Sequence, residues 1–362
     1  MTNTCKNVIK VITIKFGRTK MIKYLLSEEG NFYKTALHCH STISDGKFTP
    51  AELKKEYMER GFSVVAFTDH EIMIPHPELM DENFLPITAI EIAIDKKANW
   101  GKFQNTYHMN VYSPELCRSV TKTFCESYVK KEHTQALVTD EMRENGMSGR
   151  EYSRDFAQRV IDVATEEGCL VSLNHPVWSL QTKEDYSGLH GLFGVEWMNT
   201  GANLSGYIDS MQPLVDLWLE GEKMCYPLAT DDTHSMNQLG KSWLQVKATS
   251  LDYDTIFTAL RNGNFYSSNG PEIIDLYVKE GIVYIKVAKA KKVTLVCDHR
   301  YVVNVNNKEN NDVFEAQIPL ADYREHLDHL PEGHHPWIRF DVLGDGGAYA
   351  RTRAYFPEEI FE

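Results

Sequence analysis

The sequence has no long apolar run, so it offers no segment suited to a membrane. A bilayer span needs about 18 or more consecutive apolar residues, whereas the best N-terminal run, from Val8 to Phe16, is interrupted by Lys10 and Lys15. The N-terminus also lacks the small-residue cleavage site of a secretory signal. We therefore expect a cytoplasmic protein without membrane contact.

Paired cysteines are also missing. The sequence has 7 cysteines, an odd number, and no two of them form a CxxC motif. This pattern gives no sign of a disulfide framework, and reduced thiols fit the reducing cytoplasm. Cys39, Cys169 and Cys225 lie in apolar, strand-like runs, where we expect cysteine to serve as a small buried hydrophobe.

Basic residues are outnumbered by acidic ones. The chain has 38 Lys and Arg against 51 Asp and Glu, which gives a net charge of −13. An acidic surface repels a polyanion, so we expect no binding of duplex nucleic acid through a basic face. Any anionic substrate must be attracted locally. The composition is globular, and 362 residues suggest two domains at about 150 residues each.

The chain divides into three parts. Residues 1–30 begin with a basic stretch and are expected to be an N-terminal leader. Residues 31–270 alternate strand-like and helix-like segments, which predicts a parallel β/α architecture of the barrel type. One helix should begin at Thr49, because Thr, Pro and Glu follow in the order of a capping box. Strands are expected at 33–40, 63–67, 85–91, 107–112, 169–173, 194–198 and 226–229, and helices at 49–60, 153–167, 208–219 and 251–261.

The third part, residues 271–362, has a different sequence pattern. Short runs with period-two alternation are separated by Gly, Asn and Asp turns. This pattern predicts a smaller antiparallel β domain of the sandwich type. The polar stretch 114–150, in the middle part, has no clear period, and we expect it to be an insertion over a site.

Histidines and carboxylates recur where the predicted strands end. His38 and His40 are two residues apart in a strand, so both side chains point the same way and can hold one ion. The other strand-end candidates are Asp45, His70, Glu91, His108, His175, Asp232 and His234. The carboxyl ends of barrel strands form the active site of such folds. The conjunction of these residues predicts a metal centre rather than a set of structural histidines.

Some nearby residues are less certain members of this centre. Asp231 is an alternative to Asp232, although the spacing to His234 favours Asp232. Asp69 is expected to orient a ligand histidine rather than bind metal. Trp178 is expected either to wall the pocket or simply to pack. Further histidines read as ordinary turn or loop residues: His76, His190 and the run from His326 to His335.

These motifs together resemble the PHP domain, a family named for polymerase and histidinol phosphatase. The resemblance covers about residues 33–268 and rests on the following matches: HxH(S/T)xxSDG at His38 to Gly46, TDH at Thr68 to His70, Glu91, His108, NHP at Asn174 to Pro176, and DxH at Asp232 to His234. It implies a distorted seven-stranded β/α barrel. The downstream β segment resembles the domain appended in the CehA-like subgroup.

The resemblance also implies two or three divalent ions (Zn, Mn or Fe) and their ligands. The first ion is implied to bind His38, His40, Glu91 and Asp232. The second is implied to bind Glu91, His108 and His175, and the third Asp45, His70 and His234. The family has histidine in some members at the Asp45 position, so occupancy of the third site stays open. Catalytic roles are implied for His38, His40, Glu91, Asp232 and His234.

This metal centre suits hydrolysis of a phosphate ester. Three divalent ions bring a formal charge of about +6 against about −3 from the carboxylates, so the pocket should attract a small phosphorylated substrate. Two ions can also lower the pKa of a bridging water towards about 7 for attack. We expect a phosphoesterase that acts on a small phosphomonoester or a nucleotide-like phosphodiester. Cationic side chains that could contact the phosphate are Arg118, Lys130, Lys131, Arg143, Arg150 and Arg154.

Two other functions stay open. An ester or amide hydrolase would use the same metal centre with a different electrophile, as the CehA-like resemblance allows. A binding or regulatory module would use the metals structurally. A polymerase-associated role is disfavoured, because 362 residues leave no room for a polymerase.

Overall fold

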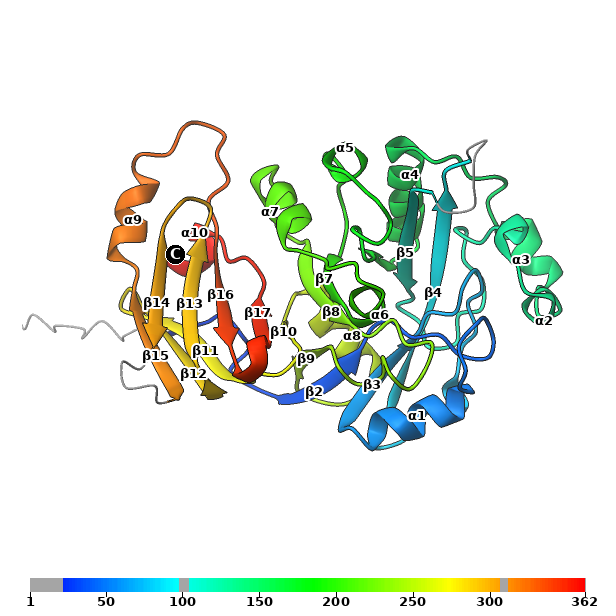
Figure 1. The fold of residues 1–362 in the computed structure, drawn as a ribbon, viewed down its shortest axis with the longest axis horizontal. Coiled ribbons are helices and arrows are strands. Elements are labelled where there is room, and N and C mark those ends of the chain that lie inside the picture. Colours follow the sequence, from blue (N-terminus) through cyan, green and yellow to red (C-terminus); the bar gives the residue numbers. More distant parts are fainter. Residues whose placement is uncertain (1–21, 98–103, 307–311, 362) are drawn as a thin grey trace, which may run out of the picture.

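The computed structural model describes residues 22–97, 104–306 and 312–361. It is a mixed α/β fold with a 13-stranded sheet and a separate 4-stranded antiparallel sheet (Figure 1). The strands of the large sheet are β2 (Asn31–Ala36), β3 (Phe62–Phe67), β4 (Leu85–Asp95), β5 (Thr106–Tyr112), β6 (Leu170–Leu173), β7 (Gly194–Asn199), β8 (Tyr226–Thr230), β9 (Trp243–Ala248), β10 (Phe265–Ser268), β13 (Lys292–Cys297), β14 (Val302–Asn306), β16 (Ile338–Leu343) and β17 (Tyr349–Thr352). The small sheet contains β1 (Ile22–Tyr24), β11 (Ile273–Lys279), β12 (Ile282–Ala290) and β15 (Val313–Pro319).

The helices lie mainly in the connections between strands. The α-helices are α1 (Pro50–Met58), α2 (Glu132–Gln135), α3 (Asp140–Asn145), α4 (Arg154–Glu166), α5 (Lys183–Tyr186), α6 (Thr200–Leu204), α7 (Gln212–Leu219), α8 (Tyr253–Arg261), α9 (Ala321–Leu327) and α10 (Pro357–Phe361). Single 3₁₀ turns are η1 (Pro77–Leu79), η2 (Glu126–Tyr128) and η3 (Asp345–Gly347). No helix among the described residues is long and apolar enough to cross a bilayer.

The best-predicted helix boundaries are confirmed and have clear local causes. At α1, the Thr49 side chain accepts from the Glu52 backbone N–H, and the Glu52 carboxylate accepts from the Thr49 N–H, so the capping box is present. Gly61 follows that helix with φ of 79°, a conformation that glycine adopts without strain. Ser153 caps α4 with a single bond, in which its hydroxyl oxygen accepts from the Phe156 N–H. Short local signals therefore set these helices.

The part of the large sheet from β2 to β8 corresponds to the predicted β/α unit, but it is not uniformly parallel. β2, β3 and β4 are parallel, as are β6, β7 and β8. Strand β5 runs antiparallel to both β4 and β6. The expectation of an all-parallel unit is therefore wrong at β5.

These strands also do not close into a barrel. In the described part of the chain, β8 and β2 are joined through the isolated parallel bridge between Cys39 and Thr233, just past the ends of both strands. The free side of β2 is already covered by β9, which pairs antiparallel with it from Asn31 to Thr35. Since each strand has only two edges, β8 can approach β2 only beyond Thr35. The predicted α/β class is thus confirmed, whereas no closed barrel is found among the described strands, and β9 was not predicted.

The C-terminal part forms two packed β layers. Strands β13, β14, β16 and β17 extend the large sheet through β10, because Tyr266 of β10 pairs with Thr352 of β17. The 4-stranded sheet packs against them, and residues such as Leu276 and Phe340 share one buried cluster. Strand β1 joins this small sheet by pairing with β11, although it lies in the predicted leader. Residues 1–21 of that leader are outside the described residues.

Candidate metal centre

The nine predicted site residues lie at one edge of the β2–β8 sheet. His38 and His40 follow β2, His70 follows β3, and His175 follows β6. The remaining members are Glu91 within β4, Asp45 in the loop after His40, and Asp232 and His234 after β8. His108 was expected at a strand's C-terminal end but is the third residue of β5. It still reaches the same edge, because β5 runs antiparallel to β4 and pairs His108 with Ala93.

Glu91 is the centre of this cluster. Its carboxylate is buried, and imidazole nitrogens approach it from several strands. The nitrogen-to-oxygen distances are 3.3 Å from His38, 3.3 Å from His40, 3.1 Å from His70, 3.1 Å from His108 and 3.5 Å from His175. One carboxylate that meets so many imidazoles is suited to bridge cations.

Asp232 is the second carboxylate that several histidines share. Its Oδ1 lies 3.2 Å from His40 Nε2 and 3.4 Å from both His38 Nε2 and His234 Nδ1. Asp232 has φ of 52° and His175 has φ of 27°, values that side-chain-bearing residues rarely adopt. Strain of this kind persists where the surrounding structure holds a functional geometry in place.

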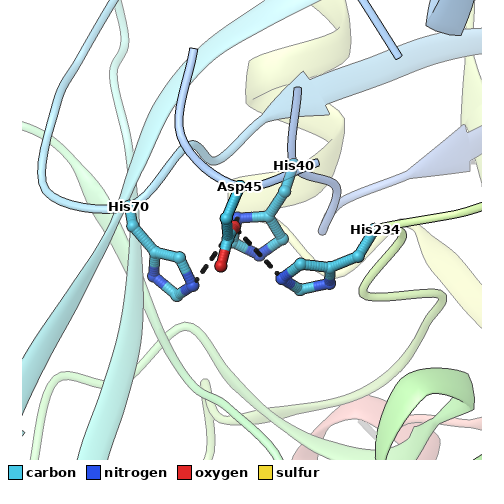
Figure 2. Close-up of side chains that lie close together, drawn as sticks. All are labelled: His40, Asp45, His70 and His234. Atoms are coloured by element: carbon cyan, nitrogen blue, oxygen red, sulfur yellow. Dashed lines mark ion pairs between the residues drawn. The ribbon is translucent and has the colours of Figure 1, made fainter. Parts of the chain in front are cut away.

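Asp45 forms the outer end of the cluster, beside His40, His70 and His234. Figure 2 shows the imidazoles of His70 and His234 on either side of the Asp45 carboxylate. Asp45 Oδ1 lies 3.3 Å from His234 Nε2 and 3.8 Å from His70 Nε2 (Figure 2). These side chains are partly exposed, whereas His38, His40 and Glu91 are buried. Asp45, His70 and His234 are therefore the outer predicted ligands, which a substrate can reach.

The donor atoms fall into four overlapping groups whose members all lie within 4.8 Å of one another. The groups are His40–Asp45–His70–His234, His38–His40–Asp232, His38–Glu91–His175 and His70–Glu91–His108. They differ from the implied ligand sets in three respects. His108 groups with His70 and His175 with His38, Glu91 is absent from the group of His38, His40 and Asp232, and His40 also joins the group of Asp45, His70 and His234. The assignment of each residue to a particular ion stays a prediction.

The hydrogen bonds of the histidines fit metal binding. His38 Nδ1 donates to Glu196 at 2.7 Å, and His234 Nδ1 donates to the Asp232 carbonyl oxygen at 3.0 Å. A metal ligand must be a neutral imidazole, and with its proton on Nδ1 each ring presents the Nε2 lone pair to the cluster. His40 Nδ1 and Asp232 Oδ1 are buried without a hydrogen-bond partner in the described structure. Buried nitrogen and oxygen atoms without a hydrogen-bond partner are suited to act as ligands of one or more divalent cations.

The carboxylates and histidines of the cluster shift one another's pKa values. Burial opposes charge on Glu91 and Asp232, but the surrounding histidines hold the pKa of each carboxyl well below its usual range. Burial also opposes charge on His40, but the nearby carboxylates of Asp232 and Glu91 raise its pKa to about 10. At His70, burial and the neighbouring His40 lower the pKa to about 3. The centre thus holds ionised carboxylates, and a bound cation would replace the imidazolium protons.

Glu196 is a site residue that the sequence reading missed. Its carboxylate is fully buried in β7 and accepts from four donors. These are His38 Nδ1, the Thr230 hydroxyl, the His175 backbone N–H and the Asn199 side-chain amide, at 2.7 to 2.9 Å. The available signal was a charged residue in the middle of the apolar run Gly194 to Met198. Such an outer carboxylate fixes the ring orientation of a ligand histidine.

We expect Glu196→Gln to weaken metal binding about 10- to 100-fold, the range for outer partners of metal ligands. In the variant, the NH₂ group of glutamine would face hydrogen-bond donors that in the wild type all donate to the Glu196 carboxylate. At least one of these hydrogen bonds would be lost. Competition with a chelating dye would measure the affinity of the full-length variant. An unchanged affinity in a folded Glu196→Gln protein would show that Glu196 does not orient His38.

The two nearby aspartates have structural roles. Asp231 accepts from the backbone N–H groups of Gly240, Lys241 and Ser242, so its carboxylate holds that loop. This geometry favours Asp232 as the residue that faces the ions. Asp69 accepts from both the backbone and the hydroxyl of Ser41 and Ser44. The expectation that it orients a ligand histidine is wrong, since it anchors the loop that carries Asp45.

A cavity of about 810 Å³ opens beside the outer group of ligands. Its lining includes Asp45, His70 and His108 from the cluster. The cationic side chains in the lining are Lys96, Lys97, Lys130 and Lys131, and the aromatic ones are Tyr128, Trp178 and Tyr207. The Trp178 ring lies 4.9 Å from that of His175, so Trp178 walls the pocket and also packs on a predicted ligand.

The inserted segment 114–150 contributes to this cavity through Lys130 and Lys131. Other cations that were considered as phosphate contacts have different partners. Arg150 is buried on Glu71, and Arg143 pairs with Glu126 and Asp140 on the surface. Arg118 donates to Glu115, and Arg154 to the Ser187 carbonyl oxygen. Of the six predicted cations, these two lysines line the cavity, where Lys130 lies 3.3 Å from the Asp95 carboxylate.

Comparison with known proteins identifies the domain. Residues 36–174 match the family model of the PHP domain. The predicted PHP domain is thus confirmed over this range. The match includes His38, His40, Asp45, His70, Glu91 and His108, whereas His175, Asp232 and His234 lie beyond its end. Only the fold brings these last three to the same cluster.

More distant likenesses appear among solved structures, and a comparison with curated proteins finds no match. A two-domain protein from Bacteroides vulgatus ATCC 8482 that contains a predicted PHP-like metal-dependent phosphoesterase is 13% identical, with a TM-score of 0.42 over 92% of this chain and 98% of that chain. The lesion-specific endonuclease PfuEndoQ from Pyrococcus furiosus is 17% identical, with a TM-score of 0.40 over 64% of this chain and 56% of that chain. Similarity at this level is too low to indicate a substrate.

Proposed function

We propose that this protein is a metal-dependent phosphoesterase that hydrolyses a small phosphomonoester or a nucleotide-like phosphodiester. The observation that supports it most is the joining of two features: a cluster of histidine and carboxylate donors around Glu91, and a lysine-lined cavity that opens on the outer donors. The first feature suits divalent cations, and the second suits an anionic ligand. A cavity of about 810 Å³ is in the size range for small molecules.

The residues of the site would have different roles in this reaction. Divalent ions, when bound, polarise a phosphoryl oxygen and supply a nucleophilic water at neutral pH. Asp45 and His234 are each about one-third exposed (32% and 31%), so they border the space in which the scissile phosphate would sit. His234 holds a proton on Nδ1 through the Asp232 carbonyl, which orients its other nitrogen towards Asp45. Glu196 and Asn174 keep His38 and Glu91 in position by hydrogen bonds of 2.7 and 2.9 Å.

The cavity lining also favours a substrate with two unlike ends. Lys130 and Lys131 come from the start of the α2 region, and Lys96 and Lys97 follow β4. Trp178 is 39% exposed and presents an apolar surface next to His108 and His175. A phosphate near the ions and lysines, joined to a planar or apolar group against Trp178, would use both surfaces.

The test is hydrolysis of a panel by the full-length protein loaded with Zn, Mn or Fe(II). We expect release of 4-nitrophenol from its phosphate mono- or diester and little release from its acetate. Turnover of acetate or an aryl carbamate alone would overturn the phosphoesterase proposal in favour of an ester or amide hydrolase. No turnover across both panels, with metal bound, would point to a binding module.

Replacing both Lys130 and Lys131 by methionine should raise KM for the phosphoester several-fold. Each exposed charge contact contributes about 0.2–1 kcal/mol, and salt should screen it. The effect should therefore shrink at high ionic strength. Lys55→Met, on the exposed face of α1 and outside the cavity lining, is the matched control. Equal KM values for the double variant and the control would show that these lysines do not meet the substrate.

A further inference from the structure

A second cluster of metal-binding side chains lies in the C-terminal β layers, away from the PHP centre. Cys297, Asp298 and His299 are consecutive residues at the end of β13, and their donor atoms lie within 4.8 Å of one another. His326, near the end of α9, and His334, in the loop before β16, also approach Asp298. The expectation that the histidines from His326 to His335 are ordinary loop residues is therefore wrong for these two, which contact a buried carboxylate.

Asp298 organises this cluster. Its side chain is fully buried, at 0% exposure, and its partners are imidazoles. Asp298 Oδ2 lies 2.7 Å from His334 Nε2 and 3.6 Å from His326 Nε2, and Oδ1 lies 3.3 Å from His299 Nδ1. The Cys297 Sγ is 3.3 Å from the same His299 nitrogen. Three histidines and a thiol thus surround one buried carboxylate.

Ordinary pairing does not account for this arrangement. A buried carboxylate is costly unless it is paired, and no Lys or Arg forms an ion pair with Asp298 in the described part of the chain. His326 Nε2 is buried and has no hydrogen-bond partner there, although it points at Asp298. The rings of His299 and His326 stack with centroids 3.3 Å apart. Several side chains that can bind metal therefore meet at Asp298, and one of their nitrogens, His326 Nε2, has no hydrogen-bond partner in the described structure.

We infer that Cys297, Asp298 and His299 form the core of a second divalent-cation site. His334, which lies on the other carboxylate oxygen of Asp298, would shift towards the ion as the fourth ligand, with His326 as an alternative imidazole. A thiolate, imidazoles and a carboxylate form a mixed ligand set that suits Zn²⁺ in a four-coordinate site. The Cys297 thiol now donates to the Tyr301 carbonyl oxygen at 3.1 Å. Binding would exchange that S–H bond for a sulfur–metal bond and release one proton to solvent, with no redox change.

The position of the site indicates a structural role. His334 lies in the loop between α9 and β16, which ends at Trp337. The Trp337 ring packs on Trp218 of α7 at 5.1 Å, inside the buried cluster of the β/α part. A cation held by β13 and this loop would therefore tie the C-terminal layers to the loop that contacts α7. The imidazoles of His299 and His334 are about one-quarter exposed (28% and 27%), which leaves a route for the ion.

The test begins with the wild-type, full-length protein titrated with Co²⁺ and with Zn²⁺. The proposal expects an absorption band from thiolate-to-cobalt charge transfer, because the ligands proposed for the PHP centre include no thiol. The band should disappear in Cys297→Ser and persist in Cys117→Ser, an exposed cysteine outside the cluster. Absence of the band in the wild type, or its persistence in Cys297→Ser, would overturn the site.

A second measurement protects this result from misfolding of the variant. Elemental analysis of His334→Ala and of His329→Ala, from the same segment, should show about one equivalent of zinc fewer only in His334→Ala. Added zinc should raise the unfolding temperature of Glu91→Gln, whose second site is intact, and raise it less in a Glu91→Gln His334→Ala double variant. Equal zinc content in both histidine variants would contradict the inference. None of these readouts depends on phosphoester turnover.

Discussion

Glu91→Gln is expected to lower phosphoester hydrolysis by more than about 100-fold, beyond the range of 10- to 100-fold seen for outer partners of metal ligands. Glu91 is the carboxylate that five histidines approach within 3.5 Å. Glutamine has nearly the same size, so packing should survive. It carries no charge, however, and one of its two terminal atoms is a donor, which cannot bind a cation.

The loss should appear in metal content as well as in rate. Elemental analysis should show fewer ions in Glu91→Gln, because two of the four donor groups contain this carboxylate. Circular dichroism would show that the variant is folded. His190→Gln is the matched control, since His190 is an exposed histidine that bonds to Gln158. A Glu91→Gln protein with full metal content and near wild-type rate would refute the central role of Glu91.

Arg150→Met should lower the free energy of unfolding by about 3–5 kcal/mol, the cost of breaking a buried ion pair by removing one partner. Arg150 Nη1 lies 2.7 Å from Glu71, and both side chains are almost completely buried. The same guanidinium donates to the carbonyl oxygens of Ala93 and Thr123. It therefore joins the inserted segment to β4 next to the metal centre, and its loss would leave Glu71 as an uncompensated buried charge.

Chemical denaturation of the full-length protein would measure this effect. Arg143→Met is the matched control, because Arg143 pairs with Glu126 and Asp140 on the surface and should change stability by about 0–1 kcal/mol. Adding Glu71→Gln to Arg150→Met should recover part of the loss, because it removes the stranded charge. If the double variant were no more stable than Arg150→Met, the charge argument would fail.

Much of the site was readable from the sequence because its residues occur in short, local motifs. The spacing of His38 and His40 puts two imidazoles on one side of the chain, and the structure brings both nitrogens to Glu91. The capping box at Thr49 is likewise confirmed, since it involves residues only three apart. Local chemistry of this kind survives in any tertiary context that permits the element to form.

Other features had no local signal. Nothing near His108 shows that β5 runs antiparallel, yet this direction carries His108 to the ligand edge from the start of its strand. The role of Glu196 depends on β6, β7 and β8 lying side by side, because its donors come from all three regions. Cys297 and His334 are likewise far apart in the sequence and meet through Asp298 and His299.

The sequence by itself determined the chemical identity of the centre, that is, which imidazoles and carboxylates are available and which short motifs carry them. The tertiary structure alone decided how they combine. Pairing of β9 with β2 occupies the edge that β8 would need to close a barrel, so that among the described residues β8 and β2 are linked through the Cys39–Thr233 bridge just past their ends. The physical reason is that motif spacing acts along the chain, whereas strand order and direction are set by which edges and apolar faces remain to be covered.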